Sequence, residues 1–273
     1  MSLAQPGPGS ALPAQGGYPA ARAQLPPLDE VAGSYRVRFA RDAADLDRLL
    51  RCRYEVFNLE LHEGLDSAHL TGRDEDRFDA VMHHLLVETR AGGQVVGTYR
   101  LQTDEMARAH AGYYSAGEFR LDGLGDAVLD AAVEIGRACV AREHRNGRVL
   151  TLLWRGLAAY LAWNRKRYLF GCCSLTTQDL DLGHRTHAWL VAQGHAAAGA
   201  PVTPLPGLEC PPAPDAGGGG APVHIPALFA SYLRLGASVC GPPAIDREFK
   251  TIDWLVLLDT DRLDDATRRS LFR

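Results

Sequence analysis

The sequence predicts an α/β (α+β) protein with a mixed central sheet and helices on both of its faces. Apolar residues alternate with a period of two in several short segments and recur at helical spacing in others, which indicates strands interleaved with helices. A strand hairpin is followed by one strand–helix–strand unit, and such a unit requires a parallel strand pair. Residues 34–195 contain no proline, so most of this pattern is uninterrupted.

The individual elements follow from these periods. The segment after the first strand begins at Asp42, whose carboxylate is suited to cap the first turn of a helix. Two apolar runs flank the turn 91–93 and predict a hairpin. In chain order we expect strands at 35–39, 85–88, 95–101, 133–140, 168–175 and 251–258, and helices at 42–56, 149–163, 182–193 and 227–235.

Proline and glycine divide the chain into segments. Six of the 16 prolines lie in residues 1–33 and eight lie in residues 196–226. Residues 1–33 offer few large apolar side chains, so we expect a disordered tail. Residues 196–226 include four consecutive glycines and predict a long flexible loop. We therefore expect one domain over residues 34–273, interrupted by this loop.

Composition excludes several classes of protein. The 273 residues carry a formal net charge of -4 and a pI of about 6.2, so the chain is no general binder of nucleic acid. No uncharged apolar run approaches the roughly 18 residues of a membrane span, and no signal peptide is visible. The six cysteines form no Cys-x-x-Cys pair, which favours a reducing, cytoplasmic compartment. Metal-hydrolase and phosphate-loop motifs are absent, so no metal or resident cofactor is expected.

Charged residues inside apolar segments are the strongest chemical signal. Arg53 ends the first predicted helix, Arg100 lies in the hairpin, and Glu134 and Arg137 lie in one strand. A charge flanked by apolar neighbours must be paired or functional, because burial without a partner is costly. A structural ion pair among these groups and a catalytic role are both open interpretations.

The same residues belong to an ordered set of motifs. The set comprises Arg53-x-x-x-Phe57, Asp76-x-x-Asp79, Arg100 after a Gly-Thr pair, and Glu134-x-x-Arg137. This order resembles the signature of acyl-homoserine-lactone synthases, which belong to the GCN5-related N-acyltransferase (GNAT) superfamily. Longer segments are more similar to the L-ornithine N-alpha-acyltransferases of ornithine lipid biosynthesis, among them 53–57, 96–101, 112–119, 134–140, 153–156, 171–174, 232–237 and 239–244.

The resemblance implies a GNAT-type, V-splayed sheet whose two central strands separate to admit a thioester and an amine. It covers residues 36–260, both pieces of the expected domain. The turn 141–149 departs from the pattern, because acetyl-CoA-dependent relatives use a glycine-rich turn to cradle the pyrophosphate and this turn holds one glycine. The loop 196–226 is a second departure.

The implied reaction is attack by an α-amine on an acyl thioester, which needs a base, an oxyanion donor and an acid. Glu134 is the candidate base, and a role limited to orienting Arg137 is open as well. A strand amide near Cys139 or Val140 could stabilise the oxyanion. Ser174 could protonate the leaving thiolate, and a plain strand-end hydroxyl is its competing interpretation.

An amino-acid acceptor adds a carboxylate and, in ornithine, a second ammonium group. Arginine binds carboxylates through paired N–H groups, so Arg100 and Arg137 are the candidates, with Arg53 behind them. The residues that could bind the second ammonium are Asp76, Asp79 and Glu105. The aromatic side chains that could line an acyl channel, or simply belong to the core, are Phe57 and Tyr99.

The segment after the strand 133–140 is strongly basic. Residues 142–167 hold seven basic residues against one acid, Glu143. Acyl carrier protein is acidic, so this patch predicts where it docks. A general preference for arginine over lysine in this sequence is the competing explanation. The docking candidates are Arg142, Arg145, Arg148 and Arg155.

The residues and the resemblance together imply an enzyme that transfers a (3-hydroxy)acyl chain from acyl carrier protein to the α-amine of L-ornithine, giving lyso-ornithine lipid. The acyl-phosphopantetheine arm of the carrier protein is then a co-substrate, and the amphiphilic product could bring a cytoplasmic enzyme to the inner membrane face. An acyl-homoserine-lactone or other N-acyl-amino-acid synthase is the alternative enzyme. A CoA-dependent acetyltransferase and a degenerate binding module are weaker alternatives.

Overall fold

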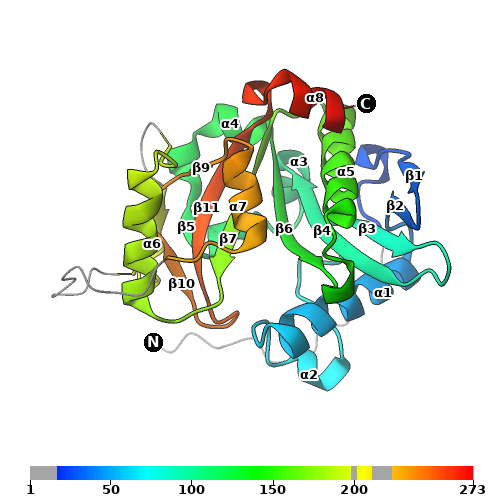
Figure 1. Cartoon of the computed structure of the whole chain (residues 1–273), viewed down its shortest axis with the longest axis horizontal. Helices are drawn as coiled ribbons and strands as arrows, with labels where there is room; N and C mark the ends of the chain where they lie inside the picture. The colour runs from blue at the N-terminus through cyan, green and yellow to red at the C-terminus, as the bar shows by residue number, and fades with distance from the viewer. Residues whose placement is uncertain (1–16, 198–201, 211–222, 273) are drawn as a thin grey trace.

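The structure is a computed structural model that describes residues 17–197, 202–210 and 223–272 (Figure 1). Its strands are β1 (Asp29–Ala32), β2 (Tyr35–Phe39), β3 (His83–Thr89), β4 (Val95–Thr103), β5 (Phe119–Arg120), β6 (Ala132–Val140), β7 (Tyr168–Leu175), β8 (Thr203–Pro204), β9 (Ser238–Val239), β10 (Ala244–Asp246) and β11 (Thr251–Asp259). Its α-helices are α1 (Ala43–Tyr54), α2 (Ala68–Thr71), α3 (Asp104–Ala109), α4 (Asp126–Asp130), α5 (Arg148–Asn164), α6 (Leu180–Ala192), α7 (Ala227–Arg234) and α8 (Asp265–Leu271). Shorter helical turns are η1 (Arg22–Gln24), η2 (Glu55–Glu60), η3 (Ser115–Gly117), η4 (Leu121–Leu124), η5 (Arg142–His144) and η6 (Thr260–Arg262).

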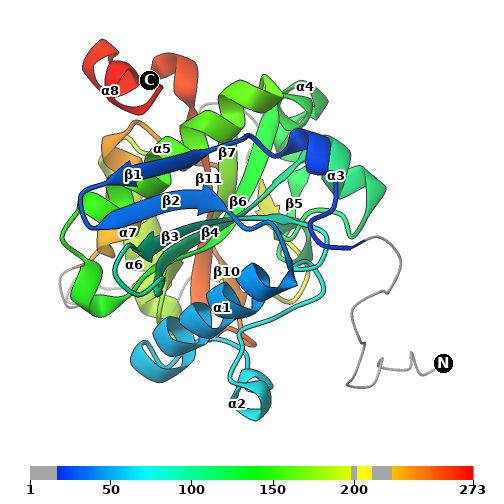
Figure 2. The ribbon, with the colours of Figure 1, turned by 90° about the vertical axis from the view of Figure 1, so that its right-hand side faces the viewer.

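One large mixed sheet organises the molecule. Its strands follow the order β1-β2-β3-β4-β6-β7-β11-β10, and β9 pairs with β11. Among the described strands, β6 and β7 form the one parallel pair, and α5 connects them as the expected strand–helix–strand unit. Helix α5 covers one face of the sheet and α1 the opposite face (Figure 2). The predicted α/β fold with helices on both faces is confirmed.

The predicted elements agree with the structure, with small shifts at their ends. β2 and β7 occupy the predicted residues. Helix α1 begins after Asp42, whose side chain accepts a hydrogen bond from Asp45 N at 2.9 Å, as the capping argument requires. The elements that the sequence did not predict are short, because two to seven residues carry too little periodicity to be recognised.

The N-terminal segment is in part ordered, contrary to prediction. Residues 29–32 pair with β2 as an edge strand. Leu25 is buried in the main core, and Trp163 Nε1 of α5 donates a hydrogen bond to Ala23 O. The prediction of a disordered tail is therefore wrong for residues 22–32. A few contacts with the core hold this segment, although its composition is poor in apolar residues. Residues 1–16 lie outside the described part of the chain.

The Pro/Gly loop is also in part built into the fold. Of residues 196–226, the structure places 202–210, whose β8 pairs with β5. Val202 and Cys210 are buried in this stretch, so a description of it as a flexible loop is wrong. Residues 198–201 and 211–222 lie outside the described residues. Within the described residues, no helix combines the length and hydropathy needed to cross a bilayer.

Candidate active site

The two central parallel strands separate after a short paired stretch. β6 and β7 pair over only three residues each, ending at Glu134 and Phe170, although both strands continue to Val140 and Leu175. Residues of both strands line a cavity of about 520 Å³ in the gap. The V-splayed geometry that the resemblance implied is therefore present in this sheet.

Two backbone features shape the apex of the gap. A Cβ on Gly171 of β7 would lie 2.0 Å from Ile135 O, so only glycine permits this close approach. On β6 the register with β4 shifts between Thr98 and Arg100, which marks a β-bulge. Arg137 adopts a left-handed φ of 47° in this stretch. Bulges redirect side chains, and the side chain of Arg137 lines the cavity.

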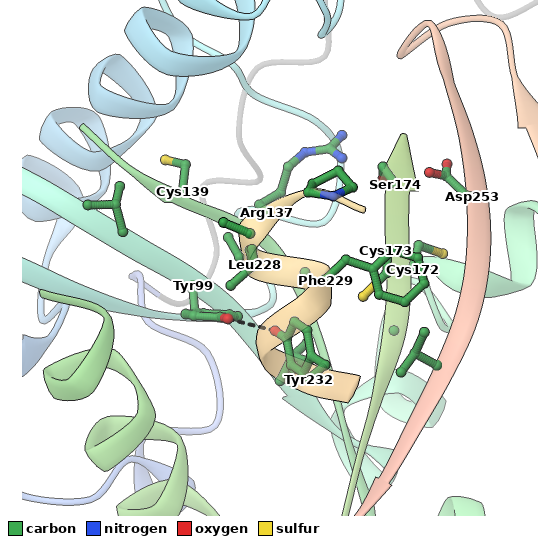
Figure 3. Close-up of a pocket in the computed structure, with 18 of the residues that line it drawn as sticks. Tyr99, Arg137, Cys139, Cys172, Cys173, Ser174, Leu228, Phe229, Tyr232 and Asp253 are labelled. Atoms are coloured by element: carbon green, nitrogen blue, oxygen red, sulfur yellow. Dashed lines mark hydrogen bonds between the residues drawn. The ribbon is translucent and has the colours of Figure 1, made fainter. Parts of the chain in front are cut away.

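The cavity is apolar near the apex and polar at its open end (Figure 3). Leu169 of β7 lies opposite Leu258 of β11 near the apex, whereas Ser174 lies opposite Asp253 toward the open end. Helix α7 lies in front of the gap, where the hydroxyl groups of Tyr232 and Tyr99 are hydrogen-bonded at 2.6 Å. An acyl chain fits the apolar end, and a polar reacting group fits the open end.

The cavity also connects the two faces of the sheet. Successive residues of β11 point to opposite faces, and the ring of Trp254 packs against Phe229 of α7 at a centroid distance of 6.1 Å. Asp253 therefore points away from α7. The cavity is lined by Phe229 on one face and by Tyr114 and Glu118 on the other. Two ligands approaching from opposite faces can meet in the gap.

Behind the open end lies a group of buried ions that we call the Arg/Asp network: Arg53, Arg100, Arg137, Asp74, Asp76 and Asp79. Arg53 donates to Asp74 Oδ2 at 2.8 Å and to Asp79 Oδ1 at 2.6 Å. Burial by itself would raise the pKa of Asp79, but the charges of Arg53 and Arg100 lower it well below its usual range. The network is therefore ionised and held by mutual pairing.

This pairing occupies most of the predicted substrate-binding residues. Arg100 donates to Asp76 Oδ1 at 2.6 Å and to Asp79 Oδ1 at 2.9 Å. Arg53, Arg100, Asp76 and Asp79 are not among the residues that line the cavity. For these four the structural ion-pair interpretation fits the geometry. Glu105, the third candidate for an ammonium ligand, bonds to Lys166 at 2.7 Å near the surface.

Arg137 is the member of the network that reaches the cavity. Its Nη2 lies 3.2 Å from Asp76 Oδ2, and its Nη1 donates to Tyr114 Oη at 3.2 Å. The guanidinium carbon lies 4.2 Å from the ring centre of Phe249, which also lines the cavity. Arg137 is thus the predicted carboxylate ligand that the structure places where a ligand can bind.

Glu134 is buried and does not line the cavity. Its carboxylate accepts hydrogen bonds from Gln102 Nε2 at 2.6 Å, Tyr114 N at 3.0 Å, and both the backbone N and the Oγ of Ser115 at 2.7 Å. It forms no hydrogen bond with Arg137. With four donors on two oxygens, this carboxylate is placed to fix the 114–118 segment rather than to take a proton from a ligand.

Four other carboxylates line the cavity, and none of them was a predicted site residue: Glu63, Glu118, Asp246 and Asp253. Glu63 accepts a hydrogen bond from Thr176 Oγ1 at 2.6 Å, and burial raises its pKa to about 7. Burial likewise raises the pKa of Asp253 to about 6. Asp253 could have been predicted in the same way as Arg100, because it too is a charged residue with apolar neighbours in a predicted strand, 251–258.

The remaining predicted site residues lie around the gap. Ser174 lines the cavity and lies opposite Asp253 on the neighbouring strand. Cys139 also lines it, but a hydrogen bond with Cys52 and burial raise the pKa of its thiol well above the usual value. The cavity wall also includes Phe57, which packs edge-on against Phe249 at 5.4 Å. Tyr99 contributes to the wall near the apex.

Val140 presents its backbone N–H to the gap. Ala141 N donates to Val96 O of β4 at 2.9 Å. Because N–H groups alternate between the two edges of a strand, the N–H of Val140 lies on the edge turned away from β4. A donor at this edge is available to a ligand between β6 and β7.

The basic patch of residues 142–167 is less unbalanced than its sequence indicates. Acids from elsewhere in the chain neutralise part of it: Glu60 bonds Arg145, Glu30 bonds Arg155, Glu105 bonds Lys166, and Asp259 bonds Arg167, each at 2.6 or 2.7 Å. The prediction that this patch lacks compensating acids is therefore wrong, because acids that are distant in the sequence lie next to these basic residues in the fold. Arg142 and Arg148 stay exposed and form no ion pair with the described residues.

Several known proteins are similar to this chain. Residues 52–155 match the family described as an acetyltransferase (GNAT) domain. The chain is 34% identical over 245 residues to the L-ornithine N(alpha)-acyltransferase of Agrobacterium fabrum, covering 83% of this chain and 81% of the relative. It is 32% identical over 257 residues to the enzyme of the same name from Rhizobium meliloti, covering 89% and 86%. A solved structure, the acyl-homoserine-lactone synthase LasI, is 14% identical with a TM-score of 0.49, covering 88% of this chain and 96% of that one.

Proposed function

The chain belongs to the family of L-ornithine N-alpha-acyltransferases, and on that premise we propose that this acyltransferase moves an acyl chain from a thioester to the α-amine of ornithine. The observation that carries the proposal is the cavity between β6 and β7, which is apolar at the apex, polar at its open end and lined from both faces of the sheet. A donor thioester and an amine acceptor require such a meeting point.

The proposed donor is acyl carrier protein. The wall of the cavity includes His144, Arg145 and Gly147, so its mouth lies at the turn before α5. Gly147 caps α5 without a side-chain hydrogen bond. Arg148 N donates to Asn146 Oδ1 at 3.1 Å, and the following amides of the first turn are left to a phosphate such as that of phosphopantetheine. The exposed Arg142 and Arg148 beside this turn suit an acidic protein surface.

The acceptor's α-carboxylate is proposed to bind Arg137, whose guanidinium is held by the Arg/Asp network and Tyr114. Bidentate pairing with a carboxylate is the strongest interaction that such a group offers. Phe249 and Tyr114 pack on the guanidinium and orient it. Arg100 supports this arrangement from behind by fixing Asp76.

The proposed reaction joins the amine nitrogen to the thioester carbonyl carbon and breaks the carbon–sulfur bond. Glu63 takes the proton from the amine, since it lines the cavity and, with a pKa of about 7, can hold a proton near neutral pH. The N–H of Val140 stabilises the oxyanion of the tetrahedral intermediate. The thiolate leaves and takes a proton from Ser174, which regains one from solvent, while Glu63 releases the amine proton to solvent. An N-acylornithine is amphiphilic, so release of the product at the inner membrane face follows from the same proposal.

The test uses purified enzyme with L-ornithine and the same acyl group on carrier protein or on CoA. Mass spectrometry should detect N-acylornithine, with carrier protein preferred by more than about 10-fold in kcat/KM. Equal use of both donors would make this a CoA-dependent N-acyltransferase, and an acyl-lactone product from S-adenosylmethionine would reject the assignment of ornithine.

Arg137→Lys tests the acceptor site separately. It keeps the charge but removes the paired N–H groups, so the KM for ornithine should rise several-fold while the KM for the donor stays unchanged. A parallel rise in both constants would contradict the assigned carboxylate site.

A further inference from the structure

An acidic cluster lies at the polar end of the cavity, and none of its members belongs to the Arg/Asp network. It consists of Glu118, Asp246 and Asp253, which place one carboxylate oxygen each within 4.8 Å of one another. Glu118 precedes β5, Asp246 ends β10, and Asp253 lies in β11. All three line the cavity.

Two members of this cluster each have a carboxylate oxygen without a hydrogen-bond donor in the described part of the chain, although Thr251 Oγ1 donates to the other oxygen of Asp253 at 3.1 Å. Glu118 is 6% exposed and Asp253 is 3% exposed. Within the described residues, no N–H or O–H group donates to Glu118 Oε2 or Asp253 Oδ1. A buried carboxylate that lacks donors is costly, and three carboxylates at this distance repel one another. A cation that enters the cavity would relieve both penalties.

The surroundings favour the ammonium group of the acceptor as that cation. Arg137, the proposed ligand of the α-carboxylate, lies close enough for its positive charge to act on Glu118. One cavity wall thus presents a guanidinium and, beside it, a group of carboxylates. This order of charges matches an amino acid whose side chain ends in a second ammonium group.

We propose that Glu118, Asp246 and Asp253 bind the terminal ammonium of a diamino-acid acceptor and thereby select it over neutral amino acids. The proposal rests on the proposed function and assigns the specificity of the same cavity.

A divalent metal ion is the competing occupant of three carboxylates. Calcium takes six to eight oxygen ligands and magnesium an octahedral shell. Asp246 Oδ1 already accepts the backbone N–H groups of Glu248 and Phe249 at 2.8 Å each. The nearby positive charge of Arg137 also repels a doubly charged metal ion more strongly than a singly charged ammonium group. We therefore argue for the ammonium and treat the metal as an outcome of the test.

The segments that position the cluster explain two other features of the chain. Leu205 N donates to Glu118 O at 2.8 Å, and Pro204 pairs with Phe119, so the ordered part of the Pro/Gly loop holds Glu118 in place. Glu134 anchors the backbone three and four residues before Glu118 through Ser115 and Tyr114. Glu134 is thus a positioning residue for the cavity.

The experiment compares L-ornithine with L-norvaline, which has the same carbon skeleton without the terminal amine. Wild type should prefer ornithine by more than about 10-fold in kcat/KM, and Glu118→Gln and Asp253→Asn should each reduce that preference by about 10-fold or more through a loss of kcat/KM for ornithine. Asp130→Asn, which removes an exposed carboxylate that does not line the cavity, is the matched control and should keep the wild-type preference.

Calorimetry supplies a readout that does not depend on turnover. Burial raises the pKa of Glu118 well above its usual value, and Asp246 and Asp253 raise it further. Ornithine binding should therefore release a proton near pH 7, seen as a dependence of the measured heat on the buffer. Norvaline binding should release none, and Glu118→Gln should abolish the effect.

The outcomes separate this proposal from the proposed function. If wild type acylates no amino acid but still binds ornithine through the cluster, the reaction is wrong and the ammonium site stands. If ornithine is acylated and its preference over norvaline survives in both variants, with the proteins folded, the ammonium site is overturned. Loss of activity with a chelator and its return with Mg²⁺ would overturn it in favour of a metal site.

Discussion

The Arg/Asp network and the acidic cluster are both buried groups of charged residues, but they differ in whether their carboxylates are paired with positive charges. In the network each carboxylate faces a guanidinium, with contacts from 2.6 Å, and Asp79 stays ionised. In the cluster the carboxylates face one another and the cavity, and no arginine or lysine among the described residues forms an ion pair with them. Paired charges build the scaffold, whereas charges left without partners mark where a ligand is expected.

The largest expected effect comes from breaking the network. Arg53→Met removes the arginine that donates to Asp74 and one of the two arginines that donate to Asp79, so the free energy of unfolding should fall by about 3–5 kcal/mol. Urea denaturation measures this loss. Arg51→Met is the control two residues away, where the exposed pair with Asp47 should contribute less than about 1 kcal/mol. Equal losses in the two variants would show that the network is no more important to stability than a surface pair.

The second effect concerns the base. Glu63→Gln should lower kcat/KM by about 100-fold, because the amine loses its proton acceptor. In wild type, activity should rise with pH through about 7 as Glu63 ionises. That rise should be absent from the variant.

Glu134→Gln serves as the comparison for Glu63→Gln. It should weaken activity by a similar factor at every pH, because it loosens the 114–118 segment without removing a titrating group from the cavity. A pH-dependent loss in Glu134→Gln, together with normal activity in Glu63→Gln, would return the role of base to Glu134.

The third effect is a difference in the sign of pH dependence between the two regions. The folded-state pKa of Asp253 is raised to about 6, so its contribution to stability is present at low pH and is lost as pH rises through 6. Asp253→Asn cannot ionise and should gain stability relative to wild type between pH 4 and pH 8, on the order of 2 kcal/mol.

Asp79 should behave in the opposite way. Its folded-state pKa is lowered, so its contribution is present above the unfolded value and is lost as pH falls. Asp79→Asn should therefore be destabilised at neutral pH and approach wild type in acid. Thermal unfolding measured from pH 8 down to about pH 2 tests both variants, because the contribution of Asp79 is lost only below its unfolded-state pKa of about 4. The same sign in both variants would contradict the distinction between the two regions.

The smallest effect concerns the exposed arginines. Arg148→Glu should raise the KM for acyl carrier protein several-fold, with a smaller change for acyl-CoA, and added salt should reduce the difference. Arg155→Glu, in a residue already paired with Glu30, is the comparison and should change the donor preference less. No change in either variant would place the docking surface elsewhere.

Much of the fold could be predicted because it depends on local periodicity. The six predicted strands and four predicted helices all occur, and Asp42 caps α1 as expected. The separation of β6 and β7 entered only through resemblance, because no local signal reports where two strands stop pairing. β1 and the ordered part of the Pro/Gly loop were missed, since long-range contacts of Leu25 and Val202 stabilise segments that composition alone describes as flexible.

The sequence by itself determined which residue types carry charge inside apolar elements and in what order the elements follow. Only the tertiary structure decided which of those charges neutralise one another. Arg53 finds Asp79 across 26 residues of sequence, and Arg145 finds Glu60 across 85. Glu118 and Asp253 meet although the segments that hold them are distant in the chain. Electrostatic energy depends on the distance between charges and on their burial, and the separation of two residues in the sequence determines neither quantity.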